Sequence, residues 1–289
     1  MSLKISGTTR VVGLFGWPVA HSLSPPMHNA AFEAAGLDFI YLCFPVAPDQ
    51  VEQAVKSIRA LGLAGINVTI PHKTAVIPFV DEISKAAQTI GAVNTIVNTK
   101  GRLSAHNTDV YGFLRSLKER DVKVKGADVV IIGAGGVARA MAMGSAVHNT
   151  QSITLCDVIA EKARELAGDV KRMAPSVDVK TVEAGSTELK SLLARASIVC
   201  NATPLGMKEG DSLPLDEESL DAIPGSAAIF DAVYSPFGTP LEKRAQARGL
   251  EYIGGLNMLL FQGVRAFELW TGHSPDIQVM KKVLKNKIT

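Results

Sequence analysis

Near its middle the chain reads Asp128-Val129-Val130-Ile131-Ile132-Gly133-Ala134-Gly135-Gly136-Val137-Ala138. The apolar run at 129–132 is typical of a buried strand, and the glycines after it permit a tight turn into a helix. The spacing matches G-x-G-x-x-G/A with Ala138 at the third small position, where a small side chain lets the helix pack closely on the strand. The stretch therefore predicts a strand, a glycine turn and a helix, as found in doubly wound parallel sheets.

The glycine turn is also a candidate binding site for a dinucleotide. Gly135 lets a pyrophosphate approach the backbone closely, and the exposed N–H groups at the start of the helix favour an anion. A glycine-rich turn without flanking elements is often only a turn, but here a strand precedes it and a helix follows. Dinucleotide binding is therefore the preferred interpretation, with contacts from Gly133, Ala134, Gly135, Gly136 and Val137.

Asp157 ends the next strand-like run, about 20 residues after the glycines. An acid at this distance accepts hydrogen bonds from ribose hydroxyls in dinucleotide sites. It can equally cap the helix expected from residue 159, and the two roles are compatible. Residues 201–207, Asn-Ala-Thr-Pro-Leu-Gly-Met, follow another buried strand and suit the same crevice at the carboxyl ends of the strands.

The rest of the chain alternates strand-like and helix-like patterns, which predicts an α/β fold with parallel sheets. Its 289 residues suggest two domains. We expect strands at residues 10–15, 39–45, 63–68, 92–98, 128–132, 152–157, 197–201 and 227–231. We expect helices at residues 25–35, 48–60, 81–90, 109–120, 135–148 and 159–173, further helices from 256 onward, and a loop at 208–214.

Composition and charge exclude several classes of partner. The formal net charge is +2, so nothing favours a nucleic acid or an anionic membrane surface. No apolar run is long enough to span a bilayer and no cleavable leader opens the chain, so we expect a cytoplasmic protein. Cys43, Cys156 and Cys200 sit in apolar runs and are expected to be buried free thiols, and no Cys/His cluster has metal-ligand spacing.

A second motif lies in the first half of the chain and reads Asn67-Val68-Thr69-Ile70-Pro71-His72-Lys73. Pro71 cannot continue a β-ladder, so the chain turns there and presents the Thr69 hydroxyl and the Lys73 ammonium from one corner. Asn94 and Asp109 follow, each at the end of an expected element. Such a set suits a small polyhydroxy ligand, and a Lys–Asp pair can move a proton. A solvated lysine or a structural salt bridge is the simpler alternative.

These motifs occur in a fixed order along nearly the whole chain, which thereby resembles the shikimate/quinate dehydrogenase family. The blocks that carry the resemblance are Ser22-Leu23-Ser24-Pro25, Asn67-Val68-Thr69-Ile70-Pro71-His72-Lys73, Gly91-Ala92-Val93-Asn94-Thr95, Asn107-Thr108-Asp109, Gly133-Ala134-Gly135-Gly136, Asn201-Ala202-Thr203-Pro204-Leu205-Gly206-Met207, Asp231-Ala232-Val233-Tyr234 and Gly255-Leu256-Asn257-Met258-Leu259 with Gln262. The resemblance implies an α/β substrate-binding domain formed by residues 1–109 and 255–289, and a Rossmann-type, doubly wound dinucleotide-binding domain at 110–254.

The resemblance also implies roles for individual residues. Lys73 and Asp109 match the pair at the reacting C3 oxygen, with Lys73 as the proton donor in the reducing direction. The substrate-binding set is Ser22, Ser24, Thr69, Asn94, Asp109, Tyr234 and Gln262, with the two serines at the substrate carboxylate. Helix capping is the alternative role for the serines. The cofactor-binding set adds Thr203, Leu205, Met207, Val233 and Gly255 to the glycine turn and Asp157.

The implied activity is the reversible reduction of 3-dehydroshikimate to shikimate in aromatic amino-acid (chorismate) biosynthesis. One alternative is an NAD-dependent quinate/shikimate dehydrogenase of broader substrate range. The other is a non-catalytic dinucleotide-binding regulator, and the intact Lys73–Asp109 pair counts against that second alternative. Relatives that use NADP have Asn-Arg-Thr where this chain has Asp157-Val158-Ile159, so the family implies NADP while Asp157 favours NAD. Ser24 favours shikimate over quinate as the substrate. The oligomeric state stays open, a homodimer included.

Overall fold

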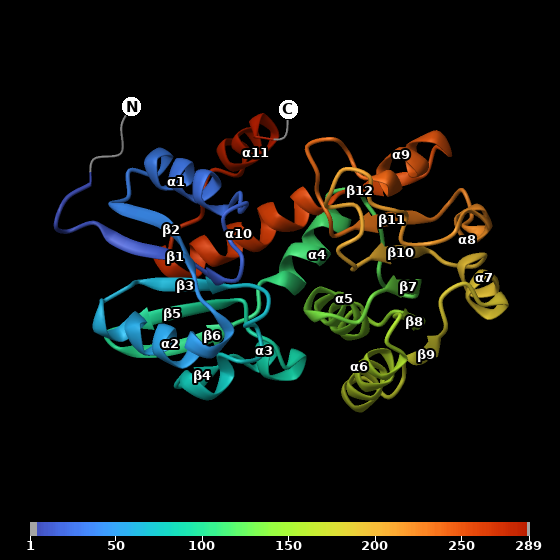
Figure 1. Cartoon of the computed structure of the whole chain (residues 1–289), viewed down its shortest axis with the longest axis horizontal. Helices are drawn as coiled ribbons and strands as arrows, with labels where there is room; N and C mark the ends of the chain where they lie inside the picture. The colour runs from blue at the N-terminus through green and yellow to red at the C-terminus, as the bar shows by residue number, and fades with distance from the viewer. Residues whose placement is uncertain (1–4, 288–289) are drawn as a thin grey trace. The chain divides into compact units, whose positions relative to one another are not determined.

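The computed structural model describes residues 5–287, which fold into two α/β units (Figure 1). Unit 1 takes the chain up to Thr108 and again from Leu259 onward, and unit 2 takes Asp109–Met258. The predicted domains put the two boundaries after residues 109 and 254. As assignments of substrate and dinucleotide binding, those domains stay predictions.

Unit 1 contains a six-stranded sheet in the order β2-β1-β3-β5-β6-β4. The strands are β1 (Arg10–Gly16), β2 (Phe39–Pro45), β3 (Gly65–Val68), β4 (Glu82–Ile83), β5 (Thr95–Thr99) and β6 (Arg102–His106). β1 runs parallel to β2 and β3, as predicted, but β5 runs antiparallel to both β3 and β6. The parallel prediction is wrong for both pairs. Between β5 and β6 the reason is local, because Lys100 and Gly101 adopt φ values of 53° and 90° and close a two-residue hairpin.

The register of this sheet brings several predicted site segments to one edge. Asn67 at the end of β3 pairs with Thr95 at the start of β5, and Thr95 pairs with His106 at the end of β6. β1 ends at the same edge, because Phe15 pairs with Val68 in parallel register. The segments that follow β1, β3 and β6, and the one that precedes β5, therefore emerge together.

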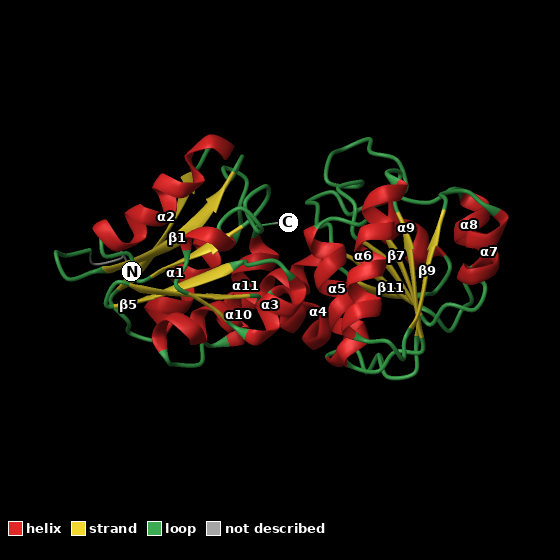
Figure 2. Ribbon diagram, turned by 90° about the horizontal axis from the view of Figure 1, so that it is seen from below, coloured by secondary structure: helices red, strands yellow, loops and turns green. Residues whose placement is uncertain are grey.

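Helices cover both faces of the sheet in unit 1 (Figure 2). They are α1 (Ser24–Ala34), α2 (Val51–Ala60), α3 (Lys85–Ile90), α10 (Gly255–Thr271, which begins in unit 2) and α11 (Ile277–Asn286), with short 3-10 turns at Pro48–Gln50 and Ile77–Phe79. α2 packs its apolar side on strand residues such as Phe15 and Ile66, and α1 lies against α11 and α10 on the opposite face. Trp270 of α10 donates its indole N–H to the main-chain oxygen of Ile96 at 3.1 Å, which ties the returning chain to the sheet.

Two local predictions in unit 1 are wrong. The helix expected at 81–90 begins only at Lys85, because Asp81 accepts the Leu103 N–H and places β4 beside β6, after which Ser84 caps α3. Cys43 is half-exposed rather than buried, whereas Cys156 and Cys200 are buried; all three thiols are free.

Unit 2 contains a six-stranded sheet in the order β12-β11-β10-β7-β8-β9, and every pair is parallel. The strands are β7 (Asp128–Ile132), β8 (Ser152–Cys156), β9 (Asp178–Val182), β10 (Ile198–Asn201), β11 (Ala228–Asp231) and β12 (Glu251–Ile253). This order is that of a doubly wound dinucleotide fold, with the strand order reversing between β7 and β10. The predicted fold class is confirmed.

The helices of unit 2 lie on both faces of its sheet (Figure 2). They are α4 (Asp109–Lys118), α5 (Gly136–Val147), α6 (Ala160–Met173), α7 (Thr187–Leu193), α8 (Glu217–Ala222) and α9 (Pro240–Ala247). Apolar residues of α7, α8 and α9 form one core with β7, β8 and β10. The predicted loop at 208–214 is confirmed, since no helix or strand covers it. Among residues 5–287, no helix has the length and apolar character required to cross a bilayer.

Candidate functional site

The turn at Pro71 is held by main-chain hydrogen bonds on both sides. The Thr69 N–H donates to Phe15 at 2.9 Å, and the Val93 N–H donates to the main-chain oxygen of Lys73 at 2.8 Å. His72 is buried and its ring Nε2 lies 2.7 Å from the main-chain oxygen of Val46, which agrees with a structural role for this histidine. The backbone of the predicted proton donor Lys73 is therefore held in place at the edge of the sheet where the predicted site segments emerge.

Gly16 allows the Thr69 segment to approach the end of β1. A Cβ atom at Gly16 would lie 2.3 Å from Cγ2 of Thr69 and 2.8 Å from Cγ1 of Val19, which is closer than such atoms can come. The loop that follows β1 carries Ser22 and Ser24, so this contact brings two predicted substrate segments together.

The two serines play different local roles. α1 begins at Ser24, and its N-cap residue Leu23 makes no side-chain cap. The Ser22 hydroxyl accepts the Ser24 N–H at 3.2 Å, so the alternative capping role is met in part by Ser22. Ser24 is buried, and its hydroxyl acts on Tyr41 of β2 by lowering the pKa of that phenol.

Asn94 is buried just before β5 and is tied to the segment after β6. Its Oδ1 accepts the Thr108 N–H at 2.7 Å, and its Nδ2 donates to the Thr108 hydroxyl at 2.9 Å. Thr108 directly precedes Asp109, the buried first residue of α4. Asn94 thus fixes the chain from which the predicted catalytic carboxylate projects.

The other predicted substrate residues lie further along the chain. Gln262 lies on α10 in unit 1 and donates from Nε2 to the main-chain oxygen of Leu259 at 2.9 Å. Tyr234 follows β11 in unit 2, where burial raises the pKa of its phenol. Asp109 is the first residue of unit 2.

The glycine turn of unit 2 fits a dinucleotide. Gly133 has φ of +105°, and a Cβ atom there would lie 2.9 Å from the main-chain oxygen of Ala202, so only glycine suits the point where the strand order reverses. Gly135 and Gly136 are exposed at the start of α5, and a Cβ atom at Gly135 would meet nothing within 4 Å. Open space beside main-chain N–H groups at a helix start is what a pyrophosphate requires.

The carboxylate of Asp157 bridges the glycine turn and the start of the next helix by hydrogen bonds. Oδ2 accepts the Ala134 N–H at 2.7 Å, and Oδ1 accepts the Ile159 N–H at 2.8 Å, just before α6. The predicted structural role is therefore present, although the N-cap residue of α6 is Ile159. Val158 beside it is 93% exposed, which leaves its side chain open to a ligand.

A buried carboxylate organises the loops after β10 and β11. Asp231 accepts hydrogen bonds from Asn201 Nδ2 (2.9 Å), the Val233 N–H (3.0 Å), the Thr239 hydroxyl (2.7 Å) and the Tyr252 hydroxyl (3.1 Å). Burial raises the pKa of Asp231, and these hydrogen bonds act in the opposite direction. Neither Asn201 nor Asp231 was predicted as a site residue, although both stand at the first position of a family block.

The predicted cofactor residues of these loops are tied to this network. The Thr203 hydroxyl donates to Asn201 Oδ1 at 2.7 Å and accepts the Leu205 N–H at 3.2 Å. The Gly255 N–H donates to the main-chain oxygen of Val233 at 3.2 Å. Met207 is exposed at the end of the first loop. Together with the glycine turn and Asp157, the cofactor set lies at the carboxyl edge of the sheet in unit 2.

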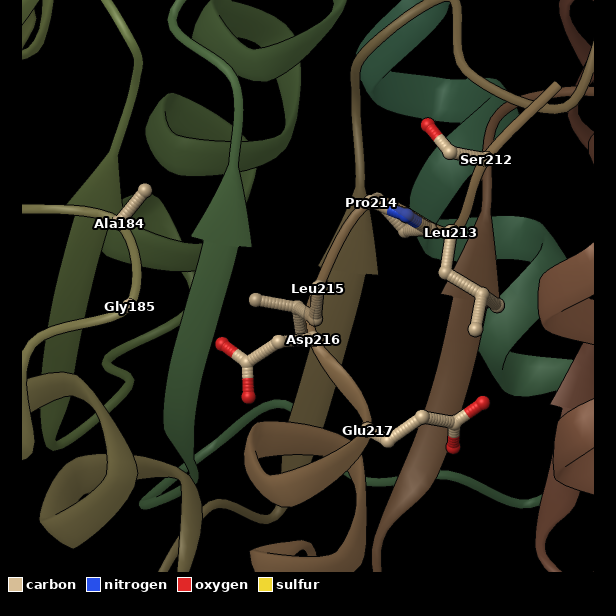
Figure 3. Close-up of a pocket in the computed structure, with 8 residues that line it drawn as sticks. All are labelled: Ala184, Gly185, Ser212, Leu213, Pro214, Leu215, Asp216 and Glu217. Atoms are coloured by element: carbon tan, nitrogen blue, oxygen red, sulfur yellow. The ribbon is translucent and has the colours of Figure 1, made fainter.

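Unit 2 also has a hollow of about 350 Å³ (Figure 3). Its lining comes from Ala184 and Gly185 after β9 and from residues 212–217 before α8. The Asp216 carboxylate in this lining caps α8 by accepting the Ser219 N–H at 2.8 Å. None of the predicted site residues lines the hollow.

Residues 5–287 contain no group of three or more His, Cys, Asp or Glu side chains that could hold a metal ion.

Comparison with known sequences matches both ends of the chain. Residues 14–96 match the shikimate dehydrogenase substrate binding domain, and residues 255–285 match the shikimate 5'-dehydrogenase C-terminal domain. A curated relative from Symbiobacterium thermophilum, named shikimate dehydrogenase (NADP(+)), is 45% identical over 276 residues, which cover 95% of this chain and 93% of that protein.

Solved structures agree over nearly the full length. A shikimate dehydrogenase crystallised with NADP+ superposes with a TM-score of 0.91 at 38% identity, covering 99% of this chain and 98% of that one. The shikimate 5-dehydrogenase of Listeria monocytogenes, crystallised with shikimate and NAD, gives a TM-score of 0.90 at 34% identity, with coverage of 98% and 99%.

Proposed function

The chain belongs to the shikimate dehydrogenase family, and we propose that it reduces 3-dehydroshikimate reversibly to shikimate with a nicotinamide dinucleotide. The enzyme is thus an NAD(P)-dependent oxidoreductase that acts on an alcohol group, as its relatives are. The observation that carries the assignment of residues is the edge of the sheet in unit 1, where the Pro71 turn, Asn94 and Thr108 meet.

Reduction of the ketone requires a hydride at the carbonyl carbon and a proton at its oxygen. The dinucleotide supplies the hydride when it is bound. Lys73 donates the proton to the forming alkoxide, and in the oxidising direction the same amine takes it back. Asp109 binds the same hydroxyl and orients Lys73. Ser22 and Ser24 bind the substrate carboxylate, while Thr69, Asn94 and Gln262 bind its ring substituents and Tyr234 walls the pocket.

Discrimination follows from buried polar groups. A substrate analogue that lacks one ring hydroxyl leaves a buried partner such as Asn94 without its hydrogen bond, which costs binding strongly. Quinate carries an additional hydroxyl at ring C1, and Ser24 disfavours it. The curated relatives between 38% and 45% identity are named for shikimate, so the quinate alternative gains no support from them.

The dinucleotide contacts come from Gly133, Ala134, Gly135, Gly136 and Val137, with Thr203, Leu205, Met207, Val233 and Gly255 on the neighbouring loops. Both NADP+ and NAD occur in the related structures. We propose that Asp157 shifts the cofactor preference of this chain toward NAD. Its negative charge repels the 2′-phosphate of NADP, which carries a charge of about −1.5 to −2 at the adenosine ribose. A homodimer stays a predicted assembly, to be tested by light scattering.

The test of the proposed function is steady-state turnover of shikimate and of quinate with NAD and with NADP, for the wild-type enzyme and for Lys73→Ala. We expect shikimate to be the better substrate, and Lys73→Ala to lower kcat by about 10²–10⁴-fold with a much smaller change in KM. Lys85→Ala, which removes an exposed lysine of the same unit, is the control and should leave kcat unchanged. A folded Lys73→Ala enzyme with near-normal kcat would refute the role of Lys73.

A further inference from the structure

Tyr41 is a fully buried residue of β2 that the proposed mechanism does not use. Its ring stacks on the ring of His28, with centroids 4.6 Å apart and planes 4° apart. Its hydroxyl donates to Oδ1 of Asn67 at 2.9 Å and also meets the hydroxyl of Ser24. Burial raises the pKa of Tyr41 well above its ordinary value, against the effect of the Ser24 hydrogen bond, so the phenol keeps its proton.

The direction of the next hydrogen bonds follows from the groups that make them. Nδ2 of Asn67 lies 3.1 Å from the main-chain oxygen of Asn94, which can only accept. The amide nitrogen of Asn67 must therefore face Asn94, and its oxygen must face Tyr41. The same nitrogen donates to the hydroxyl of Thr95 at 3.0 Å, which leaves the hydrogen of that hydroxyl for another acceptor.

That acceptor is the side-chain oxygen of Asn94. The Thr95 hydroxyl donates to it at 3.1 Å, and the Thr108 N–H donates to it at 2.7 Å. With its oxygen turned to these donors, Asn94 turns Nδ2 toward the Thr108 hydroxyl, 2.9 Å away. The residues of this chain of hydrogen bonds are all buried in unit 1, so water does not compete for their donors and acceptors; they are Asn67, Asn94, Thr95 and Thr108.

We propose that Tyr41 is a positioning residue of the substrate site, which acts through Asn67 and Thr95 to fix the side-chain amide of Asn94 as a hydrogen-bond donor. The inference rests on the proposed function, because it takes Asn94 to be a substrate-binding residue. When the Asn94 side chain is held in this orientation, its Nδ2 presents an N–H to the oxygen of a substrate hydroxyl. It also limits the choice of ligand, since an acceptor is required at that position.

The test compares Tyr41→Phe with the wild-type enzyme by calorimetric Kd for shikimate and by steady-state kinetics. Phenylalanine keeps the ring that stacks on His28 and removes only the hydroxyl. We expect Kd and KM for shikimate to rise about tenfold, which corresponds to about 1.4 kcal/mol. KM for the dinucleotide should change by less than about twofold, because no cofactor residue touches this network.

Thr95 provides a second, independent pair of variants. Thr95→Val keeps the shape of the side chain and removes the donor to Asn94, so it should raise Kd for shikimate to a similar degree. Thr95→Ser retains the hydroxyl and should restore binding. Thr150→Val is the matched control, since it deletes a buried hydroxyl of unit 2 that donates to the main-chain oxygen of Ala127, and it should leave Kd for shikimate unchanged.

A double-variant cycle tests whether the effect passes through Asn94. In an Asn94→Ala background, Tyr41→Phe should add no further loss of shikimate binding. Additive losses, or unchanged Kd in a folded Tyr41→Phe enzyme, would overturn the inference while leaving the proposed function standing. Wild-type enzyme that neither binds nor turns over shikimate would instead overturn the proposed function.

Discussion

Asp157 and Val158 together determine the charge that a cofactor meets at the end of β8. The carboxylate is held by the Ala134 and Ile159 N–H groups, so replacing it would disturb the glycine turn as well as the charge. Val158 is 93% exposed, and its replacement tests charge alone. The cofactor preference is therefore better examined at Val158.

We expect Val158→Arg to shift the ratio of kcat/KM for NADP over NAD upward by about tenfold, since a guanidinium paired with the 2′-phosphate contributes about 1.4 kcal/mol at an exposed site. Steady-state kinetics with both cofactors measures the ratio. Val147→Arg, which adds the same charge at another exposed position of unit 2, is the control. An unchanged ratio in Val158→Arg would show that the 2′-phosphate does not lie near this residue.

His28 makes the stability of unit 1 depend on pH. The ring is fully buried among Phe32, Tyr41 and Trp270, neither nitrogen has a hydrogen-bond partner among the described residues, and burial lowers its pKa to about 3. The folded pKa lies below the unfolded value of 6.5, so the unfolded chain gains the proton first as pH falls. The stabilisation is complete above about pH 6.5 and is lost toward pH 3.

This linkage predicts that the free energy of unfolding of unit 1 falls by about 2 kcal/mol between pH 7 and pH 5 on account of His28 alone. His28→Phe should lack that loss, so its stability relative to wild type should improve by the same amount over this range. Urea unfolding at the two pH values measures the difference. His273→Gln, an exposed histidine, should follow the wild type. Parallel pH profiles for wild type and His28→Phe would contradict the prediction.

The side chains that sequence motifs single out differ from those that hold them in place. Asn67, Thr95 and Thr108 stand inside the quoted motifs, but their hydrogen bonds to Asn94 become visible only with the register of β3, β5 and β6. Tyr41 lies in an ordinary apolar strand pattern and carries no motif, so its contact with Asn67 across 26 positions of sequence could not be predicted. Networks of this kind depend on tertiary pairing, which local patterns do not encode.

At the scale of elements, the sequence predicted best where the apolar pattern is continuous. The expected strands at 39–45 and 128–132 coincide with β2 and β7. The elements that were not predicted are β4, β6, β9, β12, α7, α8 and α9. β9, for example, is an edge strand of only five residues whose exposed and buried positions mix. Short edge elements take their conformation from neighbours, because their own burial is too small to decide it.

The glycine turn illustrates an element whose function and fold share one cause. Gly133 was predicted from spacing alone, and its φ of +105° with Ala202 close by supplies the physical reason for glycine. The hairpin at Lys100 and Gly101 had a weaker signal, because lysine at positive φ is uncommon and the sequence alone favoured a parallel arrangement. The sheet of unit 1 consequently departs from the predicted parallel order only after β3.

At the scale of the whole molecule, each unit has its own apolar core. One cluster gathers residues such as Phe15, Ile66 and Ile96 of unit 1, and another gathers Val130 and Val199 with others of unit 2. The proposed ligands divide in a similar way, with most shikimate contacts in unit 1 and the dinucleotide contacts in unit 2. A ligand stabilises the unit that binds it, because it binds the folded state and not the unfolded one.

This division predicts a reciprocal pattern in native-state hydrogen exchange. Shikimate at 100 times its Kd adds about 2.7 kcal/mol to the stability of unit 1, so the slowest amides of β1 and β3 should exchange about 100-fold more slowly. Those of β7 and β10 should be nearly unaffected, whereas the dinucleotide should protect β7 and β10 and leave β1 and β3 alone. Mass spectrometry of peptides covering Val12, Ile66, Val130 and Val199 follows all four strands in one experiment. Equal slowing of all four by either ligand would mean that the two cores unfold as one cooperative structure, and the prediction of independent units would then be wrong.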